Sequence, residues 1–186
     1  MFDGVLAAIA RALDAESIPY MIIGGQAVLL HGEPRLTKDI DVTLAAGLDR
    51  MDVVLRAASA AGLDPLVDPD EFTRSTMVLP CKDRGTRIRV DFIFSFSSYE
   101  KEAVKRARLV TLGGTEVRFA TAEDLIVHKV LAGRPRDLED VRSILLKNPG
   151  LDVKFVRGTL AEFDEALGRG EELRARFETI RGRTQS

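Results

Sequence analysis

The chain has 186 residues, a formal net charge of −2 and 45% hydrophobic residues, which together predict about one soluble domain and exclude wholesale disorder. The near-zero net charge argues against a surface coated with positive charge for non-specific nucleic-acid binding, but leaves room for a local basic groove. No run of about 18 uncharged apolar residues occurs, so a membrane-spanning helix is not expected. The single cysteine, Cys81, and an N-terminus without a basic region predict a cytoplasmic protein without a signal peptide.

The first third of the chain predicts alternating helices and strands. Residues 2–14 carry apolar side chains at helical spacing, as in an amphipathic helix. Residues 20–23 are a short apolar run stopped by Gly24 and Gly25, which predicts a buried strand and a tight turn. The other elements expected in this part are a short helix over 26–31, a strand over 39–44 and a helix over 49–61.

The rest of the chain divides into a strand-rich part and a helical part. After the turn-rich residues 64–71, strands are expected at 77–80 and 87–94, joined by a basic loop over 81–86, and a hairpin is expected at 108–119 around Gly113 and Gly114. The helices expected last cover about 121–132, 137–147, 152–167 and 171–181. The sequence therefore predicts an α/β (α+β) fold: a mixed sheet flanked by helices over 1–120, and a small C-terminal helical part over 121–186 packed on it as one structural unit.

Asp39 and Asp41 are the first candidate functional residues. In a strand their side chains project to the same side, about 6.6 Å apart along the strand, while Ile40 and Val42 point into the core. Two such carboxylates repel each other unless water solvates both or a cation lies between them. The pair fits either a solvated strand edge or a site for a hard divalent cation.

A third carboxylate, Asp91, occurs in the segment RIRVDFIF. Its neighbours Arg87 and Arg89 share its face of the expected strand, and the apolar residues form the other face. This pattern fits either a surface ion-pair ladder or a third metal-directed carboxylate with arginines that receive phosphate oxygens. Gly24 and Gly25 would let the backbone approach a phosphate at the start of a helix.

These residues resemble a known group of proteins. The stretch GGQAVLLHGEPRLTKDIDV resembles the signature of the DNA polymerase beta-type nucleotidyltransferase superfamily, and a later stretch, KVLAGRPRDLED, is most similar to that of AbiEii/AbiGii toxin-type and minimal nucleotidyltransferases. The resemblance runs from about Tyr20 to Leu146. It implies a nucleotidyltransferase core over 1–120, which would move an NMP from an NTP to a hydroxyl and release pyrophosphate.

The resemblance also implies roles for single residues. Asp39, Asp41 and Asp91 would be catalytic and bind one or two Mg²⁺ (or Mn²⁺) ions, and the third would also activate the attacking hydroxyl. The nucleotide would be bound by Gly24, Gly25, Arg35, Thr37, Lys129, Asp137 and Asp140. Helix capping explains Asp137 and Asp140 equally well, and Lys129 also fits a solvated helix position.

The acceptor is left open between RNA (a tRNA end), a protein and a small molecule of the kind modified by aminoglycoside nucleotidyltransferases, with RNA or protein favoured over the small molecule. The basic cluster of Arg74, Lys82, Arg84, Arg87 and Arg89 is the candidate contact for a phosphate-bearing acceptor. A toxin–antitoxin component with a cognate antitoxin partner is one setting for this activity. The rival from another class is a non-catalytic nucleotide-binding or partner-binding module of the same fold.

Overall fold

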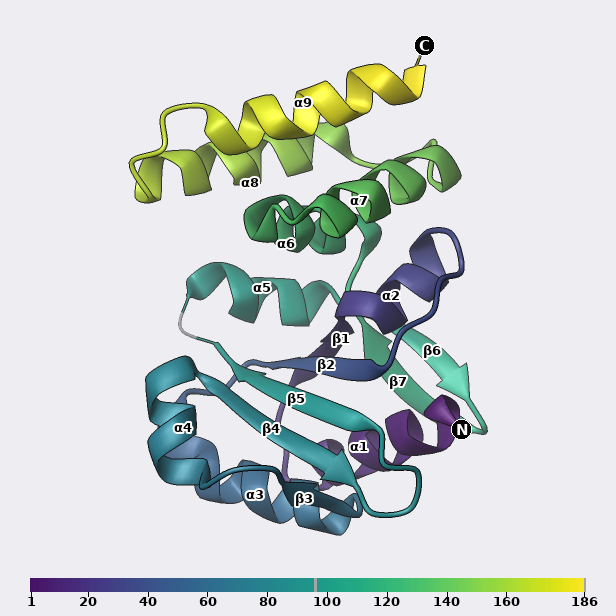
Figure 1. Ribbon diagram of the computed structural model, residues 1–186, viewed down its shortest axis with the longest axis vertical. Helices are drawn as coiled ribbons and strands as arrows, with labels where there is room; N and C mark the ends of the chain where they lie inside the picture. The colour runs from purple at the N-terminus through teal and green to yellow at the C-terminus, as the bar shows by residue number, and fades with distance from the viewer. Residues whose placement is uncertain (96, 186) are drawn as a thin grey trace. The chain divides into compact units, whose positions relative to one another are not determined.

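The computed structural model describes residues 1–95 and 97–185, which group into two compact units. The first comprises residues 1–26 and 36–120, and the second comprises residues 27–35 and 121–186, so that the division passes through one helix, α2 (Gly24–His31). Figure 1 shows the path of the chain by residue number. The packing of the helical part on the core stays a prediction.

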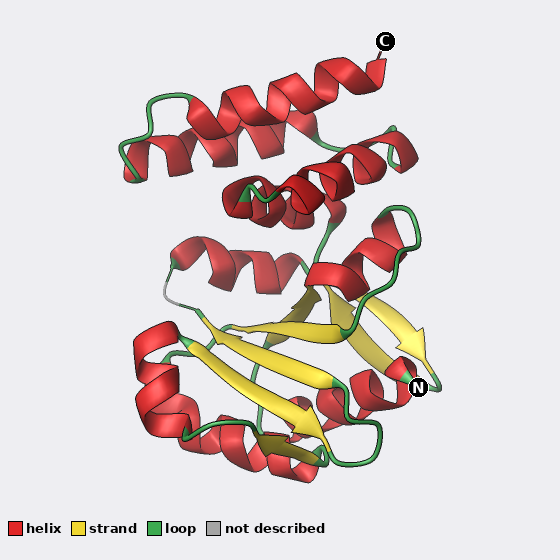
Figure 2. Cartoon of the chain, in the orientation of Figure 1, coloured by secondary structure: helices red, strands yellow, loops and turns green. Residues whose placement is uncertain are grey.

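The first unit is built on a mixed sheet of seven strands among the described residues, in the order β3-β4-β5-β2-β1-β7-β6 (Figure 2). Strand β2 lies at its centre, parallel to β5 and antiparallel to β1, and β1 is parallel to β7. The strands are β1 (Tyr20–Ile23), β2 (Asp39–Leu44), β3 (Leu63–Pro65), β4 (Val78–Asp83), β5 (Arg89–Phe94), β6 (Arg108–Leu112) and β7 (Thr115–Phe119).

Helices cover both faces of this sheet. Helices α1 (Phe2–Ala15) and α3 (Met51–Ala60), which follows a 3₁₀ turn at Leu48–Arg50, lie on one face in Figure 1, and α5 (Ser98–Arg106) lies on the other. Met21 of β1 packs against Ala103 and Val104 of α5 in a buried cluster. The mixed α/β fold expected from the sequence is confirmed.

Among its described residues, the second unit consists of the rest of α2 with four helices, which pack as the pairs α6–α7 and α8–α9 with further contacts across the pairs. Their buried residues include Leu125, Val141, Leu160 and Phe177. The helices are α6 (Ala122–Ala132), α7 (Pro135–Lys147), α8 (Val153–Ala166) and α9 (Glu172–Gln185). The helical C-terminal part is therefore confirmed. No helix in residues 1–95 and 97–185 is long and apolar enough to cross a membrane.

Two helices of the first unit were not predicted, because their caps decide them rather than an apolar stripe. Helix α4 (Pro69–Thr76) replaces part of the expected turn region: Asp68 caps it by accepting from the amides of Asp70 and Glu71, and Pro69 occupies its first turn. Helix α5 begins with a capping box between Ser97 and Glu100. Both helices are rich in polar residues and contain few apolar ones, so an apolar stripe cannot be recognised in their sequences.

Three strand and helix boundaries also differ from expectation. Residues 81–83 are not a loop but the end of β4, because Cys81 and Lys82 pair with Val90 and Arg89 of β5. Strand β5 begins at Arg89 rather than residue 87, and Arg87 takes a left-handed φ of 65°. Helix α2 begins at Gly24, so the two glycines form its first turn instead of preceding it.

Candidate functional site

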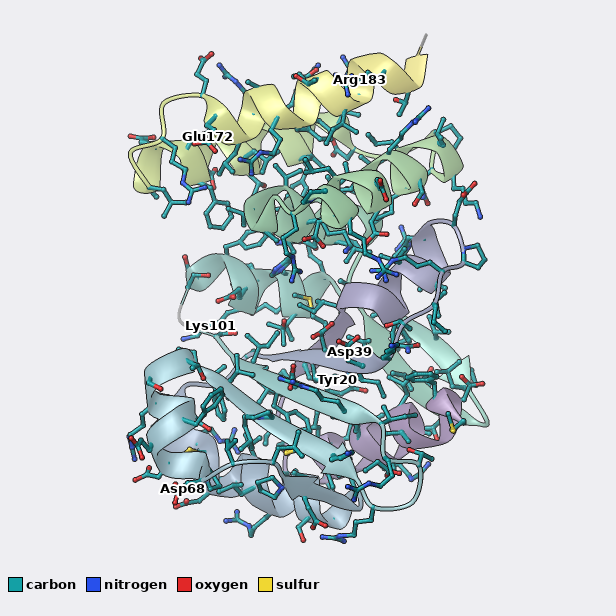
Figure 3. All side chains as sticks on the ribbon, viewed as in Figure 1. Tyr20, Asp39, Asp68, Lys101, Glu172 and Arg183 are labelled. Carbon is teal, nitrogen blue, oxygen red and sulfur yellow. The ribbon has the colours of Figure 1, made fainter. Side chains whose placement is uncertain are left out.

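Three aspartates lie on one face of the two central parallel strands. Asp41 of β2 is the register partner of Asp91 of β5, and Asp39, two residues earlier, is the partner of Arg89. Alternating residues on both strands, such as Ile40 and Val90, are fully buried on the opposite face. We call the side of β2 and β5 that carries Asp39, Asp41 and Asp91 the carboxylate face. Figure 3 labels Asp39 at the start of β2.

Arg89 partly neutralises the carboxylate face. Its Nε donates to both carboxylate oxygens of Asp91, at 2.9 and 3.1 Å. This hydrogen bond, the charge of Asp91 and the fields of Asp39 and Asp41 raise the pKa of the Arg89 guanidinium. Within the described residues no three acidic, histidine or cysteine side chains are already arranged to hold a metal ion. The three aspartates share a face without converging on one point.

The glycines at the start of α2 lie directly beside this face. A Cβ on Gly24, whose φ is 63°, would fall 1.8 Å from Oδ2 of Asp41, and a Cβ on Gly25 would fall 2.2 Å from Oγ1 of Thr37. The Thr37 hydroxyl in turn donates to Oδ1 of Asp39 at 3.2 Å. Any side chain at either glycine would displace these groups, so both positions require glycine.

The other residues expected to bind nucleotide form an ion-pair cluster in the second unit. The Nζ of Lys129 lies 2.6 Å from Oδ2 of Asp140 and 3.1 Å from Oδ1 of Asp137. Arg35 contacts Asp140 through two hydrogen bonds, and the Nε of Arg134 donates to Asp137 at 2.6 Å. Burial alone would raise the pKa of Asp137, but hydrogen bonds from Arg134 and Lys129 outweigh it and hold that pKa below its usual value.

The expected basic cluster is divided among different places of the first unit. Lys82 is the register partner of Arg89, so both cations lie on the same face as Asp39, with Arg89 directly opposite Asp39. Arg74 instead pairs with Asp70 on α4 at 2.7 Å. Arg84 follows β4 and pairs with Asp64 of β3 at 2.7 Å, and Arg87 lies in the turn before β5.

Two buried polar side chains near this face were not among the functional residues predicted from the sequence. Gln26 follows the two glycines and is 6% exposed, and Thr43 follows Asp41 by two residues and is 1% exposed. Neither Nε2 of Gln26 nor Oγ1 of Thr43 has a hydrogen-bond partner among the described residues. Each is a polar residue among apolar neighbours, Gln26 in GGQAVLL and Thr43 in DVTL, and this pattern could have indicated a buried polar group.

Solved structures with a similar fold include an antibiotic-resistance factor and a nucleotidyltransferase-like protein. The antibiotic-resistance factor ANT(2″)-Ia is 17% identical, with a TM-score of 0.60 over 90% of this chain and 95% of that chain. An antigenic nucleotidyltransferase-like protein from Paracoccidioides brasiliensis is 19% identical, with a TM-score of 0.55 over 95% and 91%. ANT(2″)-Ia in complex with adenylyl-2″-tobramycin is 19% identical, with a TM-score of 0.54 over 92% and 93%. At these identities the likeness shows the fold.

The family follows from the sequence itself. Comparison with curated proteins gives no match. The model of one protein family, described as "Nucleotidyltransferase of unknown function (DUF6036)", matches residues 4–181. This match spans both units and agrees with the fold and with the nucleotidyltransferase resemblance of the Gly-Gly and Asp-x-Asp stretch. The chain therefore belongs to the DUF6036 family of nucleotidyltransferases.

Proposed function

We propose that the chain transfers a nucleoside monophosphate from an NTP to an acceptor hydroxyl on the carboxylate face, with release of pyrophosphate. The observation that carries this proposal is the register of β2 and β5, which places Asp41 opposite Asp91 with Asp39 on the same face. All three aspartates remain partly exposed, so a ligand can reach them. Two carboxylates at neighbouring strand positions, about 5 Å apart, are a costly arrangement without a cation.

The donor set fits a hard divalent cation, Mg²⁺ or Mn²⁺. Carboxylate oxygens are the ligands such ions prefer, and they commonly combine one or two carboxylates with substrate phosphates. The absence of a side chain at Gly24 lets the Asp41 carboxylate lie against the start of α2, since a Cβ there would fall 1.8 Å from its Oδ2. One or two bound ions would polarise the α-phosphate and stabilise charge on the entering and leaving oxygens.

The chain's own residues would then divide the remaining work. Backbone N–H groups in the first turn of α2, at Gly24 and Gly25, have no intrahelical acceptor and would donate to phosphate oxygens. Asp91 would accept the proton of the attacking hydroxyl. The new bond forms between the hydroxyl oxygen and the α-phosphorus, and the bond from that phosphorus to the bridging oxygen breaks. Arg89 and Lys82 would neutralise the charge of the departing pyrophosphate.

For the acceptor we propose a small molecule with a free hydroxyl. Two observations support it over the RNA or protein acceptor that the toxin-type resemblance implies. The solved structure with adenylyl-2″-tobramycin shares this fold over 93% of its own length, so a chain of this size holds such a product. In addition, the later motif that favoured a macromolecule has Lys129, Asp137 and Asp140 engaged with one another.

The test is a labelling experiment with each of the four α-labelled NTPs, with Mg²⁺ or Mn²⁺. The acceptors are offered separately: tobramycin and lincomycin as hydroxyl-rich small molecules, a low-mass fraction of cell extract, bulk tRNA and a protein fraction. We expect label in a low-mass product together with pyrophosphate. Label in tRNA or protein would support the toxin-type function instead.

Asp41→Asn is the matched inactive variant, since it keeps the side-chain size and removes one charge. Asp64→Asn is the control, because Asp64 is an exposed carboxylate on the edge strand β3 that pairs with Arg84. The proposal fails if the wild-type chain transfers label to no acceptor, or if Asp41→Asn labels as well as Asp64→Asn. The first outcome would favour a non-catalytic nucleotide-binding module.

A further inference from the structure

The connection between α2 and β2, residues 32–38, has no helix or strand of its own, and it leads directly into Asp39. A seven-residue segment of this kind, containing Pro34, must be fixed by side-chain contacts or remain variable. Its first half and the preceding residue of α2 belong to the second unit, where the contacts of this part of the chain are found.

Residues 31–35 lie along one side of α7. The side chain of Asn148, just past the end of α7, donates to the carbonyl of His31 at 2.8 Å, and Lys147 donates to the carbonyl of Gly32 at 3.1 Å. The amide of Glu33 donates to Oγ of Ser143 at 3.3 Å. As the residue number rises from 31 to 35 in the connection, that of the contacting residue falls from 148 to 140, so the two segments run antiparallel.

The last contact of the series is the strongest. Arg35 donates through Nε and Nη2 to the two carboxylate oxygens of Asp140, at 2.7 and 2.9 Å, a bidentate geometry that fixes orientation as well as distance. The partners Asp140, Ser143 and Lys147 are spaced three and four residues apart, so they share one face of α7. Gly32 fits this face closely, because a Cβ there would fall 2.6 Å from Oγ of Ser143.

Asp140 is buried and forms ion pairs with two cations. Its side chain is 5% exposed, and Lys129, 6% exposed, supplies the second cation at 2.6 Å. A buried carboxylate held by two cations keeps a fixed position, since losing either partner leaves an uncompensated charge. The cluster is therefore a rigid anchor for Arg35, and only three residues separate Arg35 from Asp39.

We propose that Asp140 is a positioning residue that acts through Arg35 to hold residues 32–35 and thereby to restrict the rest of the connection, which leads along the chain into Asp39. This differs from the role implied by the family resemblance, in which Arg35 and Asp140 bind the nucleotide. The effect on Asp39 rests on the proposed function of the carboxylate face. The tether itself does not.

The test compares Arg35→Gln, Asp140→Asn and the double variant by backbone amide hydrogen exchange over residues 32–38, in the free protein without metal or nucleotide. We expect faster exchange in this segment in each single variant, and no further increase in the double variant, because both changes break the same contact. Glu178→Gln is the control: it breaks the Arg157–Glu178 pair between α8 and α9 in the same unit and should leave the segment unchanged. Arg35→Gln keeps the Asp140–Lys129 pair, so it still tests the contact between Arg35 and Asp140 if Asp140→Asn unfolds.

A second measurement is Mn²⁺ affinity, followed by electron paramagnetic resonance. We expect both single variants to bind Mn²⁺ about tenfold more weakly than the wild-type chain, as outer groups that orient metal ligands do. Unchanged exchange over 32–38 overturns the tether. Faster exchange with unchanged Mn²⁺ affinity overturns the positioning of Asp39. If the wild-type chain binds no Mn²⁺, the proposed function fails, and exchange still decides the tether.

Discussion

Asp41 and Asp91 are register partners on the parallel strands β2 and β5, and their carboxylates project from the same face of the sheet. Neighbouring strands lie about 4.8 Å apart, so two negative charges are held close by backbone hydrogen bonds rather than by side-chain flexibility. Asp39 adds a third charge on the same face. The backbone thus imposes a repulsion that Arg89 partly relieves in the free chain and that a divalent cation would relieve further.

Asp91→Asn is expected to reduce nucleotide transfer by about 100-fold or more, because in the proposed mechanism Asp91 supplies a charge at the reacting atoms and accepts the hydroxyl proton. The fold should survive, since Asp91 is only partly buried and its loss removes a repulsion. Pyrophosphate release measures the first effect, and thermal unfolding measures the second. Asp64→Asn, away from this face, should retain both activity and stability. An Asp91→Asn variant with full activity would exclude a role for this carboxylate.

Arg89→Met is expected to raise Mn²⁺ affinity about fivefold. The Arg89 guanidinium competes with a metal ion for the negative charges of Asp91, Asp39 and Asp41, and the substitution removes this competitor. The same change should weaken NTP binding, since it removes a cation that would face the phosphates. Titration of Mn²⁺ with and without a non-hydrolysable NTP separates the two effects. Arg84→Met, whose partner Asp64 lies on the edge strand β3, is the matched control. Weaker Mn²⁺ binding in Arg89→Met would contradict this account.

The carboxylate face could be predicted from the sequence because it depends on local pattern. Alternation of Asp and apolar residues over 39–44 fixes which side chains share a face, and the structure has β2 at these residues. The Gly-Gly pair after an apolar strand likewise locates the start of α2. The register between β2 and β5 could not be predicted from the sequence, because about 50 residues separate the two strands. This register places Asp41 opposite Asp91.

The cluster around Lys129 shows the opposite case. A lysine in a helix looks solvated in a sequence, and two aspartates three residues apart look like caps. Here they are buried and paired because α6 and α7 bring them together and Arg35 arrives from a segment more than 100 residues earlier. Long-range ion pairs of this kind leave no periodic pattern in the sequence. Helices α4 and α5 are hard to predict for another reason, because they contain few apolar residues.

Gly25→Ala is expected to lower NTP-dependent activity by about 100-fold, because its methyl group would displace the Thr37 hydroxyl and the Asp39 carboxylate that it contacts. Gly158→Ala in α8 is the matched control: no atom lies within 4 Å of a Cβ there, so the change should be neutral or stabilising by about 0.5–1 kcal/mol. Activity and thermal unfolding of the two variants are compared. Full activity in Gly25→Ala would show that the close approach of Thr37 is dispensable.

Lys129→Met is expected to destabilise the protein by roughly 3–5 kcal/mol, since it leaves Asp137 and Asp140 buried with one cation fewer. Arg74→Met, which breaks an exposed pair with Asp70 on α4, should change the free energy of unfolding little. Urea unfolding measures both. A solvated Lys129 that reaches for a triphosphate predicts the reverse: normal stability of Lys129→Met and a large loss of NTP affinity.

The second unit should lose stability in acid through Glu178. The hydrogen bond from Arg157 outweighs the opposing effect of burial and, with a smaller contribution from Arg181, lowers the pKa of Glu178 from 4.5 to about 2. Because the folded-state pKa is depressed, the contribution of this carboxylate is fully present above about pH 4.5 and is lost as the pH falls toward 2. Glu178→Gln should therefore lower the unfolding temperature at pH 7, and its difference from the wild-type chain should shrink below pH 4.5. Glu165→Gln, an exposed carboxylate of α8 without an ion pair among the described residues, controls for removal of one charge. A difference between Glu178→Gln and the wild-type chain that stays constant from pH 7 to pH 3 would contradict the assignment.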